Sequence, residues 1–309
     1  MKFAARINSF LPHFDNDLSK VFKAFKELGL KYVNLNYPEH VDGYTSDEIK
    51  SMLEENDLVL NGVNMRFRDE FVKGEFGNAD PKIAKKAVDL CNEGAAFCRE
   101  LGGKIVTVWL GYDGFDYTFQ TNYGRVWDQI VSAFKNIATT NKDLKISIEY
   151  KPYQPLSFSI IDSMGVTGMI LDEVGEDNLG VTLDYCHMQM KHENPAFPAD
   201  IFGSKGKLFG IDLNDGHGLN DDGLMVGTVS PIQTLEFLYY VKKHNFDGVI
   251  YFDTFPVREN PMDETKQNIK LVETYNRILE RVGMDKIQEI INENDGIAVS
   301  NLILEFFGN

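Results

Sequence analysis

Residues 179–190 read LGVTLDYCHMQM and contain, in one stretch, the pattern that decides the fold. A short apolar run, typical of a buried strand, ends at a carboxylate, Asp184, and a more polar segment follows. Seven further runs of this kind occur along the chain. The eight predicted strands cover residues 3–7, 32–35, 59–65, 105–110, 146–149, 179–183, 208–213 and 249–252.

Longer segments with helical spacing separate these strands. The main helices expected cover residues 17–28, 80–101, 123–139, 160–174 and 231–244. Strands that alternate with helices form a parallel sheet. Eight such units without a Pro- or Ser-rich linker therefore predict one α/β domain, a (β/α)8 TIM barrel, over residues 1–283. In such barrels the functional groups lie at the carboxyl ends of the strands.

Residues 284–309 follow the eighth unit and are predicted to form one amphipathic helix with an apolar tail. A free apolar tail is poorly solvated, so we expect this C-terminal helix to pack on the barrel or on a partner subunit. Both alternatives stay open from the sequence, and the second makes a homo-oligomer the expected state.

The charge balance narrows the class of partner. The chain has 309 residues, with 31 Lys and Arg against 47 Asp and Glu, a net charge of −16 and no basic block. Such a chain repels phosphate backbones, which excludes nucleic acid as a partner. No apolar stretch approaches the roughly 20 residues of a membrane span. Because Cys91, Cys98 and Cys186 are too few for a disulfide framework, we expect a cytoplasmic protein without a membrane partner.

Carboxylates stand at the ends of the last four predicted strands. They are Glu149 in ISIE, Asp184 in VTLD, Asp212 in GIDLND and Asp253 in VIYFD. Buried carboxylates at one mouth of a barrel repel one another and are costly to desolvate unless a cation lies among them. Oxygen ligands suit hard divalent ions, so these four residues are predicted to bind Mn²⁺ or Mg²⁺, with Co²⁺ as a further candidate.

A second metal site is predicted beside the first. Asp184 and His187 lie three residues apart, just after the sixth predicted strand, and together are able to bridge to a second ion. Asp221 and Asp222, in the loop after the seventh strand, are the remaining carboxylates for that ion. One metal site is the main expectation, and the second is additional to it.

Four segments resemble the xylose isomerase-like family of barrels. They are IEYKPYQP (148–155), LGVTLDYCHMQM (179–190), LFGIDLNDG (208–216) and FDGVIYFDTFP (246–256). Their order and spacing agree with the family, and within it the xylose isomerase branch is the most similar. Weaker similarity extends back to residues 74–87 and 106–114, so the resemblance covers nearly the whole chain before the C-terminal helix.

The resemblance implies a divalent-metal-dependent enzyme that interconverts an aldose and a ketose by a hydride shift. The residues it assigns to the first metal are Glu149, Asp184, Asp212 and Asp253, and those it assigns to the second are Asp184, His187 and Asp221. It further implies that Lys151 contacts a substrate oxygen and that Trp109 forms a wall of the sugar pocket. The catalytic group is thereby Lys151, Glu149, His187 and Asp253, acting on a small sugar or sugar derivative.

Two departures from the family pattern bear on the substrate. Where the xylose isomerase branch has a histidine after the second strand, this chain has Asn36, which is neither an acid nor a base near neutral pH. The second-metal loop is also one residue shorter, which leaves the choice between Asp221 and Asp222 open. Asn36 and Asn64, at the end of the third strand, are therefore assigned to substrate binding, and xylose is not the expected substrate.

Arg66 and Arg68 follow the third predicted strand in NMRFR (64–68), where an extended chain would place them on one side. Such a pair binds phosphate, sulfonate or carboxylate groups through paired hydrogen bonds. Arg66 is therefore assigned to the substrate, which is expected to include a sugar with an anionic group. The alternative is that both arginines neutralise Asp69 and Glu70.

Other functions are weighed against the isomerase. A ketose 3-epimerase of the same superfamily uses two glutamates and one metal for proton transfer. Asp253 in place of the second glutamate, and Asp212 in place of a histidine, count against it. A dehydratase acting on a cyclic polyol is less favoured, and a non-catalytic sugar-binding protein is the alternative from another class.

A zinc-dependent abasic-site endonuclease shares the barrel but is excluded. It needs several histidine ligands from the early strands, where this chain offers Asn36, Asn64 and Trp109. The net charge of −16 also opposes DNA binding.

Overall fold

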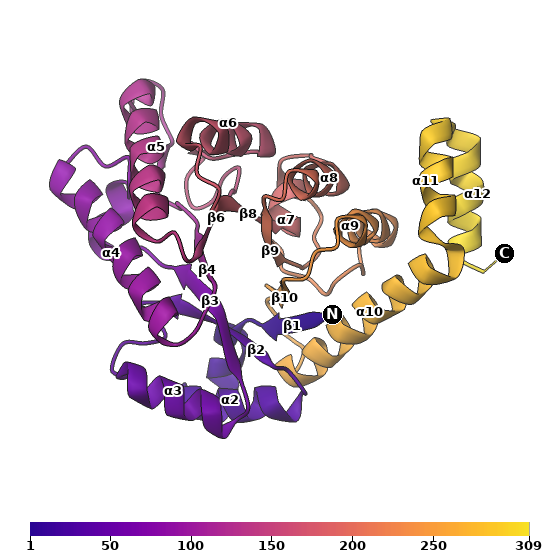
Figure 1. The fold of residues 1–309 in the computed structure, drawn as a ribbon, viewed down its shortest axis with the longest axis horizontal. Coiled ribbons are helices and arrows are strands. Elements are labelled where there is room, and N and C mark those ends of the chain that lie inside the picture. Colours follow the sequence, from indigo (N-terminus) through magenta and orange to yellow (C-terminus); the bar gives the residue numbers. More distant parts are fainter. Residues whose placement is uncertain (309) are drawn as a thin grey trace.

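The computed structural model describes residues 1–308. Its central sheet has eight parallel strands in the spatial order β1-β10-β9-β8-β6-β4-β3-β2. They are β1 (Lys2–Ala5), β2 (Tyr32–Tyr37), β3 (Val59–Met65), β4 (Ile105–Val108), β6 (Lys145–Glu149), β8 (Leu179–Asp184), β9 (Leu208–Asp212) and β10 (Val249–Phe252). Because β1 and β2 lie next to each other, the sheet curls into a nearly closed barrel (Figure 1).

Helices surround the barrel, which confirms the predicted TIM barrel (Figure 1). They are α2 (Leu18–Glu27), α3 (Ser46–Glu55), α4 (Pro81–Glu100), α5 (Tyr123–Thr140), α6 (Met164–Val174), α8 (Ala196–Ser204), α9 (Pro231–Lys243) and α10 (Pro261–Val282). The loops contain the short elements α1 (Ile7–Phe10), η1 (Leu11–His13), η2 (Asp69–Lys73), β5 (Gly114–Phe115), β7 (Phe158–Ser159) and α7 (Tyr185–Met190).

Capping residues in the sequence explain where several helices begin and end. The Asp17 carboxylate accepts the N–H of Ser19 at 3.0 Å and starts α2. Asp80 caps α4, whose first residue, Pro81, lacks the N–H that a first turn leaves unpaired anyway. Gly175, at φ 70°, ends α6 in the left-handed conformation.

The barrel interior is polar just below its mouth. Ser147 of β6 and Thr182 of β8 are buried, and their hydroxyls lie 2.7 Å apart. On β9, a Cβ at Gly210 would lie 2.5 Å from Thr182 Oγ1, so only glycine allows this close approach. Because side chains alternate along a strand, Glu149 and Asp184, two residues after Ser147 and Thr182, face the same interior at the mouth.

The C-terminal extension differs from the prediction of one helix. It forms two helices, α11 (Met284–Glu293) and α12 (Gly296–Phe306). The break has a local cause: Asn294 adopts the left-handed conformation at φ 51°, and Asp295 then accepts the N–H groups of Ile297 and Ala298 as the cap of α12. Asn and Asp favour such turns because their short side chains bond to the nearby backbone.

This helical pair packs at the end of α10, apart from the ring of strands (Figure 1). Ile287 of α11 and Leu302 of α12 are buried in the hydrophobic core. The Tyr239 hydroxyl of α9 donates to Gln288 Oε1 at 3.0 Å. The extension therefore contacts α9 and α10 of the same chain.

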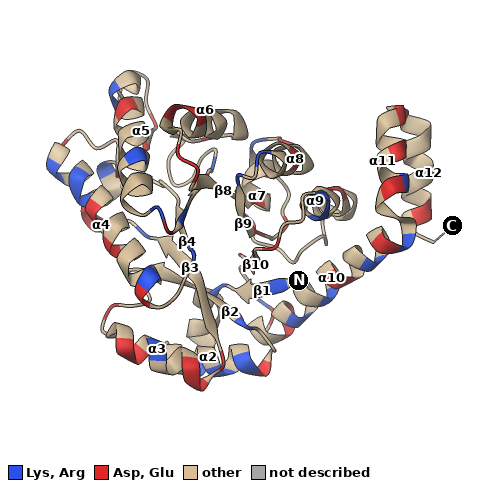
Figure 2. Cartoon of the chain, viewed as in Figure 1, with Lys and Arg blue, Asp and Glu red and all other residues tan. Residues whose placement is uncertain are grey.

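Acidic and basic residues are interspersed along the outer helices (Figure 2). Among residues 1–308, no helix combines the length and the apolar character that crossing a membrane requires. Cys91, Cys98 and Cys186 are free and buried, as expected from the absence of a disulfide framework.

Candidate metal centre

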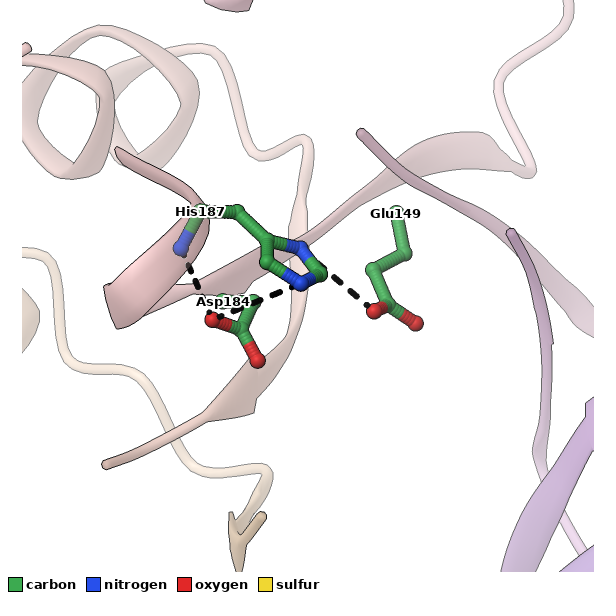
Figure 3. Close-up of side chains that lie close together, drawn as sticks. All are labelled: Glu149, Asp184 and His187. Atoms are coloured by element: carbon green, nitrogen blue, oxygen red, sulfur yellow. Dashed lines mark hydrogen bonds and ion pairs between the residues drawn. The ribbon is translucent and has the colours of Figure 1, made fainter. Parts of the chain in front are cut away.

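Three of the predicted metal ligands meet at the carboxyl ends of β6 and β8 (Figure 3). Ligand atoms of Glu149, Asp184 and His187 lie within 4.8 Å of one another, and all three side chains are buried. His187 Nδ1 is 3.6 Å from Glu149 Oε1, and its Nε2 is 3.9 Å from Asp184 Oδ1. Asp184 also caps α7 by accepting the N–H of His187 at 3.0 Å, so the three-residue spacing turns the imidazole back towards the carboxylate.

The backbone fixes which nitrogen of His187 is free. His187 Nδ1 lies 2.9 Å from the carbonyl oxygen of Tyr150. A carbonyl oxygen only accepts, so Nδ1 donates and Nε2 is left as the atom available to a metal. Nε2 points to Asp221 Oδ2 at 3.3 Å.

Asp221 and Asp222 differ in what they contact. Asp221 Oδ2 accepts from Lys151 Nζ at 2.8 Å, in addition to its contact with His187. Asp222 Oδ2 instead accepts the backbone N–H of His217 at 2.8 Å within its own loop. Of the two aspartates left open by the sequence, Asp221 is the one beside His187.

Asp212 and Asp253 lie outside the cluster of Glu149, Asp184 and His187. Asp212 ends β9, is 5% exposed, and its carboxylate accepts no hydrogen bond within the described residues. Asp253 follows β10, with Oδ1 3.0 Å from Arg6 Nε. Asp212 and Asp253 therefore lie beside the cluster at the same mouth, and Asp253 has an arginine partner.

Burial and mutual repulsion disfavour the ionised form of the carboxylates at this mouth. Burial, followed by the charges of the neighbouring carboxylates, raises the pKa of Asp212 well above its usual value. Burial likewise raises the pKa of Asp184 to about 8, although His187 lowers it, and raises that of Glu149. The side chains at this mouth therefore provide too little positive charge to keep all of its carboxylates ionised.

His187 and Asp221 shift in the opposite direction. Burial lowers the pKa of His187, but Asp184 and Asp221 outweigh it and bring the pKa to about 9. Burial raises the pKa of Asp221, but His187 and Lys151 outweigh it and hold the pKa well below its usual value. An imidazolium therefore supplies positive charge between these two aspartates.

The donors at the mouth fit a hard divalent ion. Asp221 Oδ1 is buried without a hydrogen-bond partner in the described chain, and Asp253 Oδ1 has only its ion pair with Arg6. Carboxylate oxygens with one imidazole nitrogen form a set that Mg²⁺ and Mn²⁺ accept. Residues of the predicted sets thus offer free acceptor atoms in a water-poor site.

Trp109, just beyond β4, lies near two cationic side chains, Lys151 and Arg66. Its ring centroid is 5.3 Å from Lys151 Nζ and 6.0 Å from the Arg66 guanidinium carbon. Its Nε1 is buried without a hydrogen-bond partner in the described chain. Trp109 and Lys151 are therefore adjacent at the mouth, where the resemblance placed them.

Asn36 belongs to a polar group that the sequence analysis missed. Its backbone N–H donates to His40 Nδ1 at 3.0 Å, so Nε2 carries the ring proton and donates to Asn8 Oδ1 at 2.7 Å. Asn36 Nδ2 donates to the same Asn8 oxygen at 3.0 Å. Burial lowers the pKa of His40 to about 4, which keeps the ring neutral. A histidine thus lies four residues after position 36, where it helps orient the Asn36 amide.

Asn64 pairs with Asn36 in the register of β2 and β3, and both side chains are buried. Its side-chain amide makes no hydrogen bond within the described chain. It therefore offers a free donor and a free acceptor.

Arg66 and Arg68 differ in their contacts. β3 ends at Met65, but the backbone is still extended at Arg68, at φ −139° and ψ 177°. Arg68 lies 3.5 Å from Glu39 Oε2 with its side chain 54% exposed. Arg66 alone contacts the wall of the mouth.

Arg6 was also missed by the sequence analysis. It follows β1 directly, two residues after the buried Ala4, and its guanidinium carbon lies 4.6 Å from the Phe255 ring centroid. The alternation of side chains past the first strand was the available signal.

Two loops are tied together across the mouth, one after β6 and one after β9. Besides the Lys151–Asp221 pair, the Tyr153 hydroxyl donates to the Leu219 carbonyl at 3.0 Å. Gln154 Nε2 donates to Asn220 Oδ1 at 3.2 Å. These contacts fix Asp221 over His187.

Comparison with known proteins assigns the family. The model of the family described as xylose isomerase-like TIM barrel matches residues 22–275, and the chain belongs to this family. A probable sugar isomerase of Mesorhizobium japonicum is 28% identical over 53% of this chain and 38% of its own length. The xylose isomerase of Thermus thermophilus is 26% identical over 75% of this chain. The chain spans 64% of that relative, so it covers less than two thirds of either protein.

Solved structures share the fold. An L-ribulose 3-epimerase superposes with a TM-score of 0.68 at 16% identity, covering 86% of this chain and 92% of its own. A D-tagatose 3-epimerase-like protein gives a TM-score of 0.70 at 19% identity, covering 92% of this chain and 100% of its own. The relatives in sequence and in structure thus include both isomerases and epimerases.

Proposed function

We propose that this chain is a divalent-metal-dependent aldose–ketose isomerase that acts by hydride shift. The observation that carries the proposal is the buried cluster of Glu149, Asp184 and His187. Asp221 joins it to the Lys151 ammonium, which lies 2.8 Å from Asp221 Oδ2. The identity to a probable sugar isomerase and to a xylose isomerase supports it.

The proposal gives each residue a role. Glu149, Asp184, Asp212 and Asp253 would hold the first metal, and Asp184, His187 and Asp221 the second. Bound divalent ions polarise a carbonyl and stabilise an alkoxide.

Other residues would act on the sugar directly. Lys151 would place a positive charge beside the developing oxyanion. Trp109 would exclude water from one side of the sugar. Asn36, held by Asn8, and Asn64 would bond to its hydroxyl groups.

One contact favours hydride shift over epimerisation. Epimerisation needs two carboxylates free to take and return a proton at one carbon. Asp253 is one methylene shorter than glutamate, and Arg6 Nε lies 3.0 Å from its Oδ1. Burial raises the pKa of Asp253 and Arg6 lowers it. Because Arg6 lies against the shorter Asp253 carboxylate, the proposal assigns Asp253 to the metal and not to a second proton acceptor.

An isotope experiment tests the proposal. The protein is stripped of metal with a chelator, reloaded with Mn²⁺ or Mg²⁺, and supplied with a panel of aldoses deuterated at C2. We expect ketose formation only with metal, and retention of the deuterium at C1, because a hydride shift does not exchange with solvent.

Each other outcome has a definite meaning. Loss of the C2 label to solvent during ketose formation would indicate isomerisation by proton transfer and would reject the hydride shift. Uptake of solvent deuterium at C3 of a ketose, without aldose formation, would support the epimerase. Binding of sugar and metal without turnover across the panel would support a non-catalytic sugar-binding protein.

A further inference from the structure

Arg66 stands out among the cations of the mouth. Lys151 contacts Asp221 at 2.8 Å, and Arg6 contacts Asp253 at 3.0 Å. Within residues 1–308, by contrast, no carboxylate oxygen lies within 4.0 Å of the Arg66 guanidinium, and the guanidinium donates no hydrogen bond. In a chain with a net charge of −16, such a cation has its donors free for a ligand.

The position of Arg66 is set by its neighbours. Its backbone N–H donates to the Tyr37 carbonyl at 2.8 Å, which holds the chain at the end of β3. The guanidinium lies 6.0 Å from the Trp109 ring centroid. Burial raises the pKa of Asp212 and of Glu149, and the charge of Arg66 lowers both. The free guanidinium therefore faces the same mouth as the candidate ligands.

Charge balance at this mouth favours an anionic ligand. Five carboxylates are gathered there: Glu149, Asp184, Asp212, Asp221 and Asp253. Three cationic side chains, Arg6, Arg66 and Lys151, oppose them. With one divalent ion bound these charges cancel. With the second ion of the proposed function also bound, and His187 neutral as its ligand, the mouth would carry an excess of two positive charges, which a neutral sugar leaves uncompensated.

We propose that Arg66 binds an anionic group on the substrate, a carboxylate or a phosphate, so that the substrate class is a sugar acid or a sugar phosphate. This inference rests on the proposed function. The planar guanidinium presents paired N–H donors that match two oxygens of either group, and the Trp109 ring limits its orientation.

Matched sugars test the inference by binding, without any need for turnover. Glucose, galactose and mannose are each compared with the corresponding uronate and 6-phosphate by calorimetry on the Mn²⁺-loaded protein. At least one charged sugar should bind about tenfold or more tightly than its neutral counterpart, because a charge-assisted hydrogen bond contributes at least this much. The two charged series separate carboxylate from phosphate as the group recognised.

Two arginine variants locate the effect. Arg66→Gln should abolish the preference for the charged sugar, while Arg68→Gln, the neighbouring arginine that contacts Glu39, should keep it. If Arg66→Gln does not fold, Arg66→Lys replaces it, and at least about a threefold loss is expected because an ammonium lacks the paired donors.

The inference is overturned if no charged sugar binds more tightly than its neutral counterpart, including the case in which none binds. A preference that survives Arg66→Gln also overturns it, since the anion would then contact the metal or another side chain. A preference for the anion that depends on Arg66, without isomerisation, would keep this inference and reject the isomerase. Isomerisation of neutral sugars without that preference would do the reverse.

Discussion

Asp212, the last residue of β9, and Asp215, three residues later, differ in their hydrogen bonds. Both are buried, at 5% and 0% exposure. Asp215 Oδ2 accepts the backbone N–H groups of Val229 and Ser230, and its Oδ1 accepts the Ser230 hydroxyl and the N–H of Gly216. Asp212 accepts no hydrogen bond from the described chain. The first carboxylate has donors of its own, whereas the second needs a cation.

The same contrast separates two wider regions. In the loops after β3 and β4, Asp113 accepts the N–H groups of Glu75 and Gly77, and Glu75 accepts that of Tyr112. These buried carboxylates join one loop to the other. At the mouth, Glu149 is also buried but accepts no hydrogen bond within the described residues. A buried carboxylate is thus a candidate ligand where the backbone supplies no donors.

The largest expected effect compares a glutamate from each region. Glu149→Gln removes a charged metal ligand and should weaken Mn²⁺ binding by about 100-fold or more, since even residues that only orient ligands change affinity by 10- to 100-fold. Glu75→Gln, in the joined loops, should bind Mn²⁺ as the wild type does. Calorimetry on both variants measures the difference. Equal losses of Mn²⁺ affinity in the two variants would show that Glu149 is no more a metal ligand than Glu75.

Isosteric changes at Asp215 and Asp212 give the next effect. Asp215→Asn turns an amide N–H₂ towards backbone N–H groups and should lower the free energy of unfolding by about 2–3 kcal/mol. Asp212→Asn should change it by less than about 1 kcal/mol in metal-free protein, because the raised pKa of Asp212 already favours a neutral acid of the same shape.

Urea unfolding with and without Mn²⁺ completes this comparison. Added metal should stabilise the wild type and Asp215→Asn, but much less so Asp212→Asn, because a ligand that binds only the folded state raises the free energy of unfolding. Strong stabilisation of Asp212→Asn by metal would remove Asp212 from the ligand set.

The smallest effect is a pH slope. Burial raises the pKa of Asp113 from 3.8 to about 6, although backbone N–H groups lower it. Between these pH values the folded state keeps a proton that the unfolded chain has released, so the free energy of unfolding falls as pH rises, by at most about 1.4 kcal/mol per pH unit. Asp113→Asn should remove this slope.

The comparison with Asp113→Asn measures the Asp113 proton together with its effect on Glu75, because the charge of Asp113 also raises the pKa of Glu75. His40, whose pKa burial lowers to about 4, acts in the opposite sense in both proteins, and its contribution cancels in the difference. Urea unfolding at pH 4, 5, 6 and 7 measures the two slopes. Parallel curves would show that Asp113 does not take up the proton.

The sequence predicted the features that depend on neighbouring residues. Strand periodicity located all eight barrel strands, and the carboxylates that follow the last four were visible in the same runs. The three-residue spacing of Asp184 and His187 brings the imidazole beside the carboxylate because the capping bond between them is local. The prediction that Arg66 and Arg68 share a side stays a prediction, and the ion pair of Arg68 with Glu39 was not visible in the sequence.

Contacts between distant segments could not be predicted. Arg6 and Asp253 lie on the first and last strands, and neither position alone indicates a pair. The choice of Asp221 over Asp222 depends on Lys151 of another loop. The break at Asn294 was local and readable, but the apolar residues on both sides of it suggested one continuous helix.

The contacts between the loops after β6 and β9 determine from which side of the mouth a ligand can enter. Three residues of the loop after β6 bond to the loop after β9, so this side of the mouth is closed by hydrogen bonds. They are Lys151, Tyr153 and Gln154. A sugar would then enter from the opposite rim, where β1, β2 and β3 end and Arg66 stands. Under the proposal, Arg66 would bind the charged end of the sugar at the entrance, and the carbonyl end would lie deeper, at the carboxylates.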